Sequence, residues 1–206
     1  MALARPIVCD GLLDELDRFE ALLRDLSPQD WEQPTRCAGW SVGDVARHVV
    51  GTMADVAAGR MDGLGTPEVT AREVAERQGR GPTALADECA DVRTTASKLL
   101  PLFDDVTWNG PSPGGYDGSL ADGVEALWYD AFLHADDIRD ALGLPTVLSS
   151  GIEAACSHVR FELDKRGWSG ELPADSAEAM DFVLAATGRG DAKQFTPTPI
   201  NIYAEV

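Results

Sequence analysis

The stretch SLADGVEALWYDAFLHADDIRDAL, residues 119–142, decides the fold of this 206-residue chain. Its apolar side chains recur at intervals of three and four residues, which is the pattern of one face of an α-helix. Ser119 is a good N-cap for such a helix, and Gly143 follows it as a helix stop. The stretch therefore predicts a long amphipathic helix whose apolar face must pack against other elements.

Helical periodicity dominates the rest of the chain as well. Ser41 followed by Asp44 marks the start of a second long helix, and Pro82 suits the first turn of a third. The expected ranges are 9–27, 41–60 and 82–103 for the other long helices, about 69–78 for a short one, and about 149–166 and 175–187 for two near the C-terminus. Four long amphipathic helices predict an all-α four-helix bundle with additional C-terminal helices.

The pattern predicts two units along the chain. Residues 1–147 are expected to form the bundle, and residues 148–206 a helical extension packed on it. Glycine and proline in 59–67 and 109–118 predict loops, and the second of these is a candidate lid. The tail 195–206 predicts one short strand or a segment that drapes over the bundle.

Charge and composition exclude several classes of partner. The formal net charge is −18, so the chain repels nucleic-acid phosphates and anionic membrane surfaces. It has no apolar run long enough to span a membrane and no apolar core of a signal peptide at its start. We therefore expect a cytoplasmic protein that acts on a small molecule; the oligomeric state stays open, with a homodimer as one option.

The four cysteines also favour a cytoplasmic protein. Cys9, Cys37, Cys89 and Cys156 are widely spaced and form no C-x-x-C pair, which argues against a zinc ribbon or a thioredoxin-type motif. Reduced thiols in the cytoplasm fit this pattern best. Cys37 is a candidate nucleophile, but a packed or merely exposed thiol is the favoured interpretation.

Two of the three histidines lie on expected helices beside apolar stripes. His134 takes a stripe position that the pattern reserves for an apolar side chain, and Asp130 lies one turn before it on the same face. A carboxylate and an imidazole on adjacent turns make half of a divalent metal site. His48, on the 41–60 helix, is the histidine placed to supply a third ligand.

The simpler alternative stays open at this point, since a D-x-x-x-H pair on a helix is often an ordinary hydrogen-bonded pair. His158 is interpreted as structural or exposed, and Asp136 as part of a solvated helix face. Asp137 is a candidate acceptor for a ligating imidazole elsewhere in the bundle, or a partner of the neighbouring Arg139 and Asp140 region. No dinucleotide fingerprint, P-loop or nucleophile elbow is present. The catalytic and cofactor-binding residues are not identified by these patterns.

Three segments resemble the mycothiol-dependent maleylpyruvate isomerase family of the DinB-like superfamily. Residues 34–48, PTRCAGWSVGDVARH, are similar to the family's P-T-x-C-x-G-W-[ST]-V-x-D-[LV]-x-x-H segment. Residues 130–143, DAFLHADDIRDALG, resemble its E-x-x-x-H segment followed by D-I-R-x-A-L-G. Residues 182–189, FVLAATGR, are close to L-L-x-A-L-T-G-R near the family's C-terminus.

The resemblance implies a DinB-like four-helix bundle that holds a divalent metal, usually zinc, through two histidines and a carboxylate. His48, Asp130 and His134 stand at those three positions. Asp130 replaces the family's usual glutamate and is one methylene shorter, so the metal must sit closer or the ligand must reach further. The family's C-terminal α/β domain looks truncated here, so the isomerase substrate is not carried over.

Three functions follow as hypotheses. The leading one is a metal-dependent transferase or isomerase that uses a thiol, such as mycothiol, against a small electrophilic molecule. The second is a non-thiol enzyme of secondary metabolism on the same bundle, either a metal hydrolase or a metal-free pocket. The third is a ligand-binding module that performs no chemistry.

Overall fold

The computed structural model of the chain describes residues 3–190 and 201–203. Within these residues the regular elements are helices, and the only β-type pairings are two isolated bridges. The helices are α1 (Arg5–Asp25), α2 (Val42–Ala57), α3 (Pro67–Glu76), α4 (Pro82–Leu99), α5 (Asp105–Trp108), α6 (Leu120–Ala141), α7 (Gly151–Lys165) and α8 (Ser176–Ala186). Single 3-10 turns lie at Asp30–Glu32, Leu100–Leu102 and Pro113–Gly115. The predicted all-α fold is confirmed.

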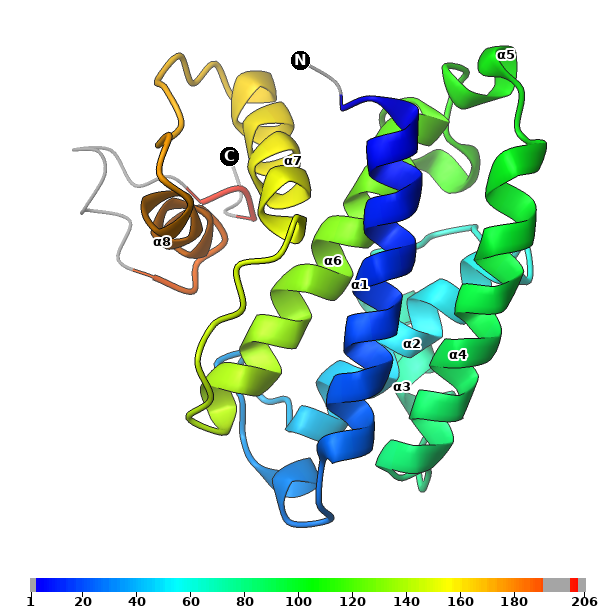
Figure 1. Cartoon of the computed structure of the whole chain (residues 1–206), viewed down its shortest axis with the longest axis vertical. Helices are drawn as coiled ribbons and strands as arrows, with labels where there is room; N and C mark the ends of the chain where they lie inside the picture. The colour runs from blue at the N-terminus through cyan, green and yellow to red at the C-terminus, as the bar shows by residue number, and fades with distance from the viewer. Residues whose placement is uncertain (1–2, 191–200, 204–206) are drawn as a thin grey trace.

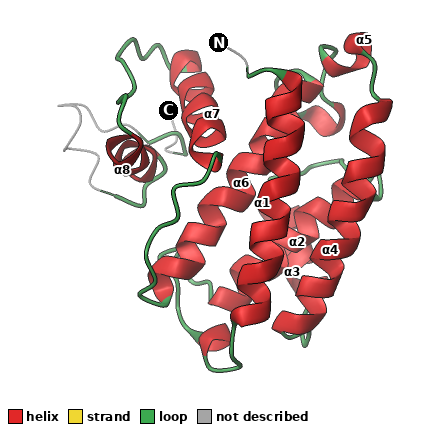
Figure 2. Ribbon diagram, viewed as in Figure 1, coloured by secondary structure: helices red, strands yellow, loops and turns green. Residues whose placement is uncertain are grey.

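Helices α1, α2, α4 and α6 form the four-helix bundle (Figure 1). α1 packs against α4 and α6, and α2 packs against the same two helices. α3 lies on α2, and loops join all of these helices (Figure 2). The largest completely buried side chains come from different helices of the bundle and include Trp128, Phe19, Leu16 and Leu85. The bundle thus buries the apolar stripes that the sequence pattern shows.

Helices α2 and α6 begin in the same way. Ser41 and Ser119 are their N-caps, and each forms a complete capping box with the aspartate three residues later. In each case the N-cap serine also forms an isolated antiparallel bridge with a preceding proline, Pro34 or Pro111. Both predicted helix starts are therefore confirmed, and the two helices enter the bundle through matching turns.

α1 and α6 approach each other closely at Gly11. A Cβ atom at this position would lie 2.3 Å from the ring of Trp128, which is completely buried. The absence of a side chain at Gly11 therefore makes room for the indole.

One buried carboxylate ties α3 to α2. Asp55 on α2 is completely buried and forms ion pairs with Arg60 and Arg72. Burial opposes ionisation of Asp55, but these two guanidinium groups outweigh it and lower its pKa. The network joins α2 to the loop that follows it and to α3.

The C-terminal helices pack on one side of the bundle. α7 lies against α6, and α8 lies against α7 (Figure 1). The Ile202 backbone N–H donates to the Ala186 carbonyl oxygen over 2.8 Å, so residues 201–203 lie beside the end of α8. Most of the predicted tail strand, 195–206, lies outside the described residues.

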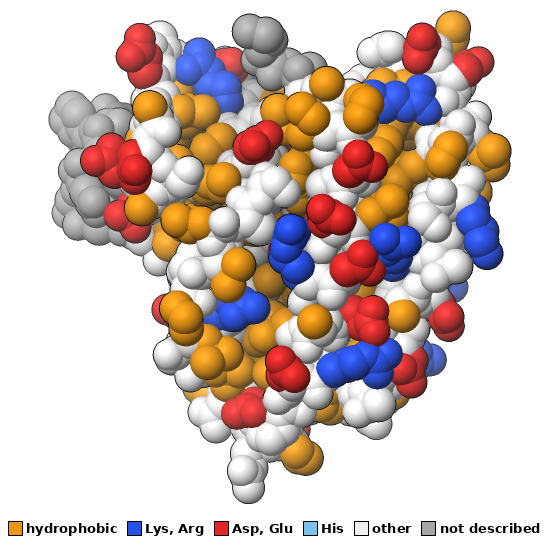
Figure 3. Space-filling view, viewed as in Figure 1, with side chains coloured by type: hydrophobic (Ala, Val, Ile, Leu, Met, Phe, Trp, Pro, Cys, Tyr) orange, Lys and Arg blue, Asp and Glu red, His pale blue; other side chains and the backbone are white. Residues whose placement is uncertain are grey.

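The surface carries charges of both signs. Figure 3 shows acidic and basic side chains interspersed over α1 and α4, where Arg93 pairs with Asp17 and Arg24 with Asp87, each over 2.9 Å. Within the described ranges, each helix is too short or too polar to cross a lipid bilayer.

Candidate metal centre and pocket

The three predicted ligands meet between α2 and α6. His48 comes from α2, and Asp130 and His134 come from adjacent turns of α6. His48 Nε2 lies 3.7 Å from Asp130 Oδ2, and His134 Nε2 lies 3.5 Å from Asp130 Oδ1. One potential ligand atom from each residue lies within 4.8 Å of the others. The arrangement brings all three residues to one point.

The opposite nitrogen of each imidazole contacts a carboxylate. His48 Nδ1 lies 3.2 Å from Glu73 Oε2 on α3, and His134 Nδ1 lies 2.8 Å from Asp137 Oδ2 on α6. Metal-ligating histidines usually donate their other ring N–H to a carboxylate in this way, which fixes the tautomer and the ring orientation. Both Nε2 atoms are therefore held toward Asp130.

The donor set and its spacing fit a divalent cation. Zinc bonds of about 2.0–2.2 Å to nitrogen and oxygen place neighbouring tetrahedral ligands roughly 3.3–3.5 Å apart. The two distances to Asp130, 3.5 and 3.7 Å, are close to that spacing although aspartate replaces the family's usual glutamate. Asp130 Oδ2 is also buried without a hydrogen-bond partner in the described part of the chain. Such an atom needs a cation or a donor to offset its burial.

The electrostatics favour positive charge at this point. Burial lowers the pKa of His48, but Asp130 and Glu73 outweigh it and raise that pKa to about 10. Burial likewise opposes ionisation of Asp130, yet His134 and His48 hold its pKa down at about 2. The Asp130 and Glu73 carboxylates thus stabilise a positively charged group between them.

Asp137 connects the candidate metal centre to two arginines that lie far away in the sequence. Its carboxylate is completely buried and accepts hydrogen bonds from Arg36 Nε over 2.6 Å and from Arg189 Nε and Nη2 over 2.8 Å each. Burial is outweighed by His134 and Arg189, which keep the pKa of Asp137 well below its usual range. Asp137 therefore holds four cationic or donating groups together: His134, Arg36, Arg189 and the Cys37 thiol.

This network corrects two expectations. Asp136 is not on a solvated face: it is 4% exposed and pairs with Arg36 over 2.6 Å. Asp137 serves the imidazole of its own helix rather than one elsewhere, and its arginine partners are not Arg139. The arginine partners were missed because Arg36 lies about 100 residues and Arg189 about 50 residues away in the chain, beyond the reach of helical periodicity. The contact between Asp137 and His134 spans only three residues and follows from helical spacing.

Trp40 and Cys37 border the centre from the loop before α2. The Trp40 ring lies 5.3 Å from the His48 ring and 6.4 Å from the His134 ring, centroid to centroid. Cys37 Sγ lies 3.1 Å from Asp137 Oδ2. Burial and the Asp137 charge raise the pKa of Cys37 to about 11, so the thiol is not activated as a nucleophile.

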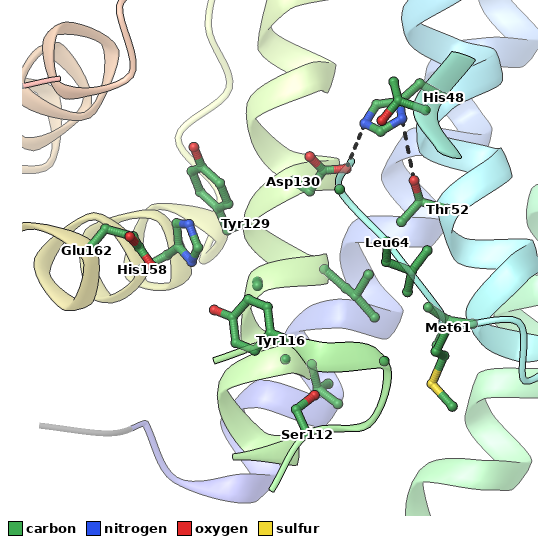
Figure 4. A pocket seen from close by; sticks show the side chains of 18 of the residues that line it. His48, Thr52, Met61, Leu64, Ser112, Tyr116, Tyr129, Asp130, His158 and Glu162 are labelled. Carbon is green, nitrogen blue, oxygen red and sulfur yellow. Dashed lines mark hydrogen bonds and ion pairs between the residues drawn. The ribbon is translucent and has the colours of Figure 1, made fainter. Parts of the chain in front are cut away.

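A cavity of about 510 Å³ opens beside the three ligands (Figure 4). The loop 109–118 contributes Ser112 and Tyr116 to its wall, which places the candidate lid at the pocket. Tyr129 also lines the cavity, and its hydroxyl group lies 2.7 Å from that of Tyr203. A pocket of this size suits a small-molecule substrate.

His158 is not simply structural or exposed, since it lines this cavity from α7. Its ring stacks on Tyr129 at a centroid distance of 4.2 Å. Burial lowers the pKa of His158 to about 4, so its imidazole is neutral at pH 7. Figure 4 shows His158 and Glu162 on the side of the cavity away from His48.

The sequence interpretation missed several residues of the candidate centre and its pocket. Glu73 gives a faint signal, because it is a charged residue one turn after Val69 on the short amphipathic α3. Tyr129, Glu162 and Tyr203 give none, since their roles depend on how α7 and residues 201–203 lie on the bundle.

A family model described as "Mycothiol maleylpyruvate isomerase N-terminal domain" matches residues 12–139. The chain belongs to this family. The match includes all three predicted metal ligands, and the resemblance to the family noted from the motifs is confirmed. A search of curated proteins gave no match.

Two solved structures are similar to this chain. They are the crystal structure of the mycothiol-dependent maleylpyruvate isomerase and that of a mutant of it with one histidine replaced by alanine. Their TM-scores are 0.64 and 0.65, at 14% sequence identity, and each match covers 96% of both chains. The likeness confirms the DinB-like helical fold. It also shows that the expected truncation of the C-terminal part was wrong, because the match spans nearly all of the isomerase chain.

Proposed function

We propose that this protein is a metal-dependent thiol transferase or isomerase that uses mycothiol and acts on a small electrophilic molecule. The observation that carries the proposal is the convergence of two imidazole Nε2 atoms on Asp130, with both Nδ1 atoms held by carboxylates. The family of the chain supports mycothiol as the thiol. The structures of the mycothiol-dependent isomerase support the same assignment through the fold.

His48, Asp130 and His134 would hold the metal, and zinc is the ion that this donor set favours. When bound, a metal of this kind lowers the pKa of a coordinated thiol and so supplies a nucleophile at neutral pH. Three protein ligands are the number found in catalytic zinc sites, where one coordination position stays open to a substrate.

The chain's own residues orient the imidazoles, exclude water, hold the electrophile and accept a proton. Glu73 and Asp137 orient the imidazoles, and the packing of Trp40 against both rings keeps water from that side of the centre. The cavity beside the centre holds the electrophile. Neutral His158 is placed to accept a proton on the far wall of that cavity.

All four cysteines are free, which supports a reducing compartment and hence the cytoplasm as the place of action. Mycothiol, as a small thiol that must stay reduced, would be available in such a compartment.

The first test is the metal content of protein purified without a chelating tag, compared with a His48→Ala, His134→Ala double variant. We expect close to one equivalent of a divalent ion in the natural protein and none in the double variant. The second test is turnover of small electrophiles with and without mycothiol. Activity that persists in the metal-free double variant would contradict the proposal.

One observation favours a second candidate, a non-thiol enzyme using the same pocket. His158 offers a neutral proton acceptor from α7, whereas the three predicted metal ligands come from α2 and α6. A hydrolysis catalysed by this pocket would depend on His158 and proceed at full rate without added thiol. The thiol-free arm of the turnover assay, repeated with His158→Gln, separates the two candidates.

A further inference from the structure

A second cavity, of about 360 Å³, lies between the bundle helices and the segment 100–113, and its wall is almost entirely apolar. Side chains from α1, α2, α4 and α6 line it, and Thr107 is the only residue with a polar side chain in its wall. Its volume is within the range of small-molecule sites, but it is too small to admit a helix of another protein. An apolar wall of this kind favours apolar ligands, because binding removes hydrocarbon surface from water.

This apolar cavity adjoins the pocket of the metal centre. Six residues line both spaces: Val56, Met61, Pro113, Leu120, Val124 and Leu127. The two cavities are therefore separated by no more than one layer of side chains. Met61 belongs to this layer, and Figure 4 shows it at the end of the pocket away from His48. Methionine is unbranched and flexible, so its side chain can shift to join the two spaces.

The spacing of residues along α6 and α2 also links the candidate metal centre to the apolar cavity. On α6, Leu120, Val124, Leu127 and Asp130 follow one another at intervals of three and four residues, so they share one face. On α2, His48, Thr52 and Val56 follow at intervals of four. Both helices thus lead from a metal ligand to a shared apolar wall, over roughly 12–15 Å at 1.5 Å per residue.

We propose that the apolar cavity binds the hydrocarbon tail of a small molecule whose polar head lies at the metal centre. The substrate class is thus an electrophile with an aliphatic or aromatic tail, rather than a short dicarboxylate. The placement of the head rests on the proposed function, whereas the tail site rests on the cavity alone. Leu99 and Phe103 line the same cavity, and the nearby Leu102 and Val106 are exposed.

The test measures binding of primary alcohols from butanol to decanol to the full-length protein by isothermal titration calorimetry. Affinity should rise roughly fourfold for each added methylene until the cavity is full, as expected for burial of hydrocarbon. A simple alcohol needs neither thiol nor metal, so this binding persists even if the thiol chemistry proposed above is wrong.

Two variants fill the cavity from different helices. Ala96→Leu on α4 and Ala57→Leu on α2 each add three carbons at its wall, and each should weaken octanol binding at least tenfold. Ala84→Leu is the matched control, because it makes the same change at an exposed position of α4. Thermal unfolding shows which variants are folded; filling an empty cavity should leave the melting temperature unchanged or raised.

The position of the head is tested with the zinc-loaded protein and octanohydroxamic acid, which combines a metal-binding head with an alkyl tail. Competition between this compound and octanol, lost on filling the cavity, supports the proposal. Simultaneous binding of both would overturn the link between head and tail. Failure of alcohols to bind, or equal binding by the filled and control variants, would overturn the tail site itself.

Discussion

The Asp137 carboxylate contacts the His134 imidazole and also pairs with two arginines, and Asp137→Asn tests these two roles. Asparagine keeps the shape of the side chain but removes the charge that faces two guanidinium groups. Arg36 and Arg189 are only 18% and 12% exposed, and Arg189 has Asp137 as its only ion-pair partner in the described chain. Leaving a buried ion without its partner costs about 3–5 kcal/mol. We expect the free energy of unfolding to fall by that amount at pH 7.

The same substitution should weaken the metal centre. Asparagine accepts a hydrogen bond from His134 less strongly than a carboxylate does, so the imidazole is held and polarised less well. Loss of such a partner typically lowers metal affinity 10- to 100-fold. Competition for zinc against a chromogenic chelator measures this effect, and urea unfolding in the presence of excess chelator measures stability without the contribution of bound metal.

Glu73→Gln is the matched control. Glu73 contacts His48 as Asp137 contacts His134, but its carboxylate faces no arginine among the described ion pairs. Zinc affinity should fall by a similar factor, whereas stability should fall by only about 1–3 kcal/mol, the cost of weakening hydrogen bonds of a buried group. Equal destabilisation by the two variants, or unchanged zinc affinity in Asp137→Asn, would refute the reasoning.

The pH dependence gives an independent check on Asp137. Its pKa is depressed in the folded protein, so the ionised carboxylate stabilises the fold above the ordinary aspartate pKa of about 3.9. That stabilisation disappears as the pH falls through the folded-state pKa. The stability gap between natural protein and Asp137→Asn should therefore be full at pH 7 and shrink in acid.

Three further predictions concern other parts of the molecule. Cys37→Ser should keep thiol-dependent turnover within about threefold, because a thiol with a pKa near 11 is not a nucleophile at pH 7; iodoacetamide labelling as fast as that of free cysteine would contradict this. Gly11→Ala should lower the free energy of unfolding by about 1–3 kcal/mol through its clash with Trp128, and an unchanged urea midpoint would count against the close packing. Asp55→Asn should lose about 1–3 kcal/mol at pH 7, because the buried side chain then accepts weaker hydrogen bonds from Arg60 and Arg72; since the Asp55 pKa is lowered on folding, this loss should diminish toward pH 2, and a gap independent of pH would disprove it.

Helical periodicity predicted the bundle because each long helix must bury one stripe, and that stripe is visible in the sequence. The same reasoning found Asp130 and His134, since residues one turn apart share a face. It also named His48 as the histidine placed to supply a third ligand, but it could not show that His48 faces the other two, because the relative rotation of α2 and α6 depends on packing across the whole core. The resemblance to the family supported that choice.

The remaining site residues lay beyond local pattern. Glu73 acts through the packing of α3 on α2, and Arg189 reaches Asp137 across 52 residues of chain. Solvation was misjudged for Asp136 for the same reason, because its partner Arg36 comes from a loop with no periodicity. Long-range ion pairs leave no regular mark on a single sequence, so the carboxylate network appeared only in the structure.

The capped starts of α2 and α6 have a consequence for how the metal centre is kept in register. Seven residues separate Ser41 from His48, and eleven separate Ser119 from Asp130. At about 100° per residue, these spacings bring each ligand within roughly 20° of its own cap residue, after two and three turns. A slip of one residue at either start would swing a ligand by about 100°, out of reach of the others. The capping boxes thus fix where each ligand lies around its own helix, while the packing of the core sets how the two helices face each other.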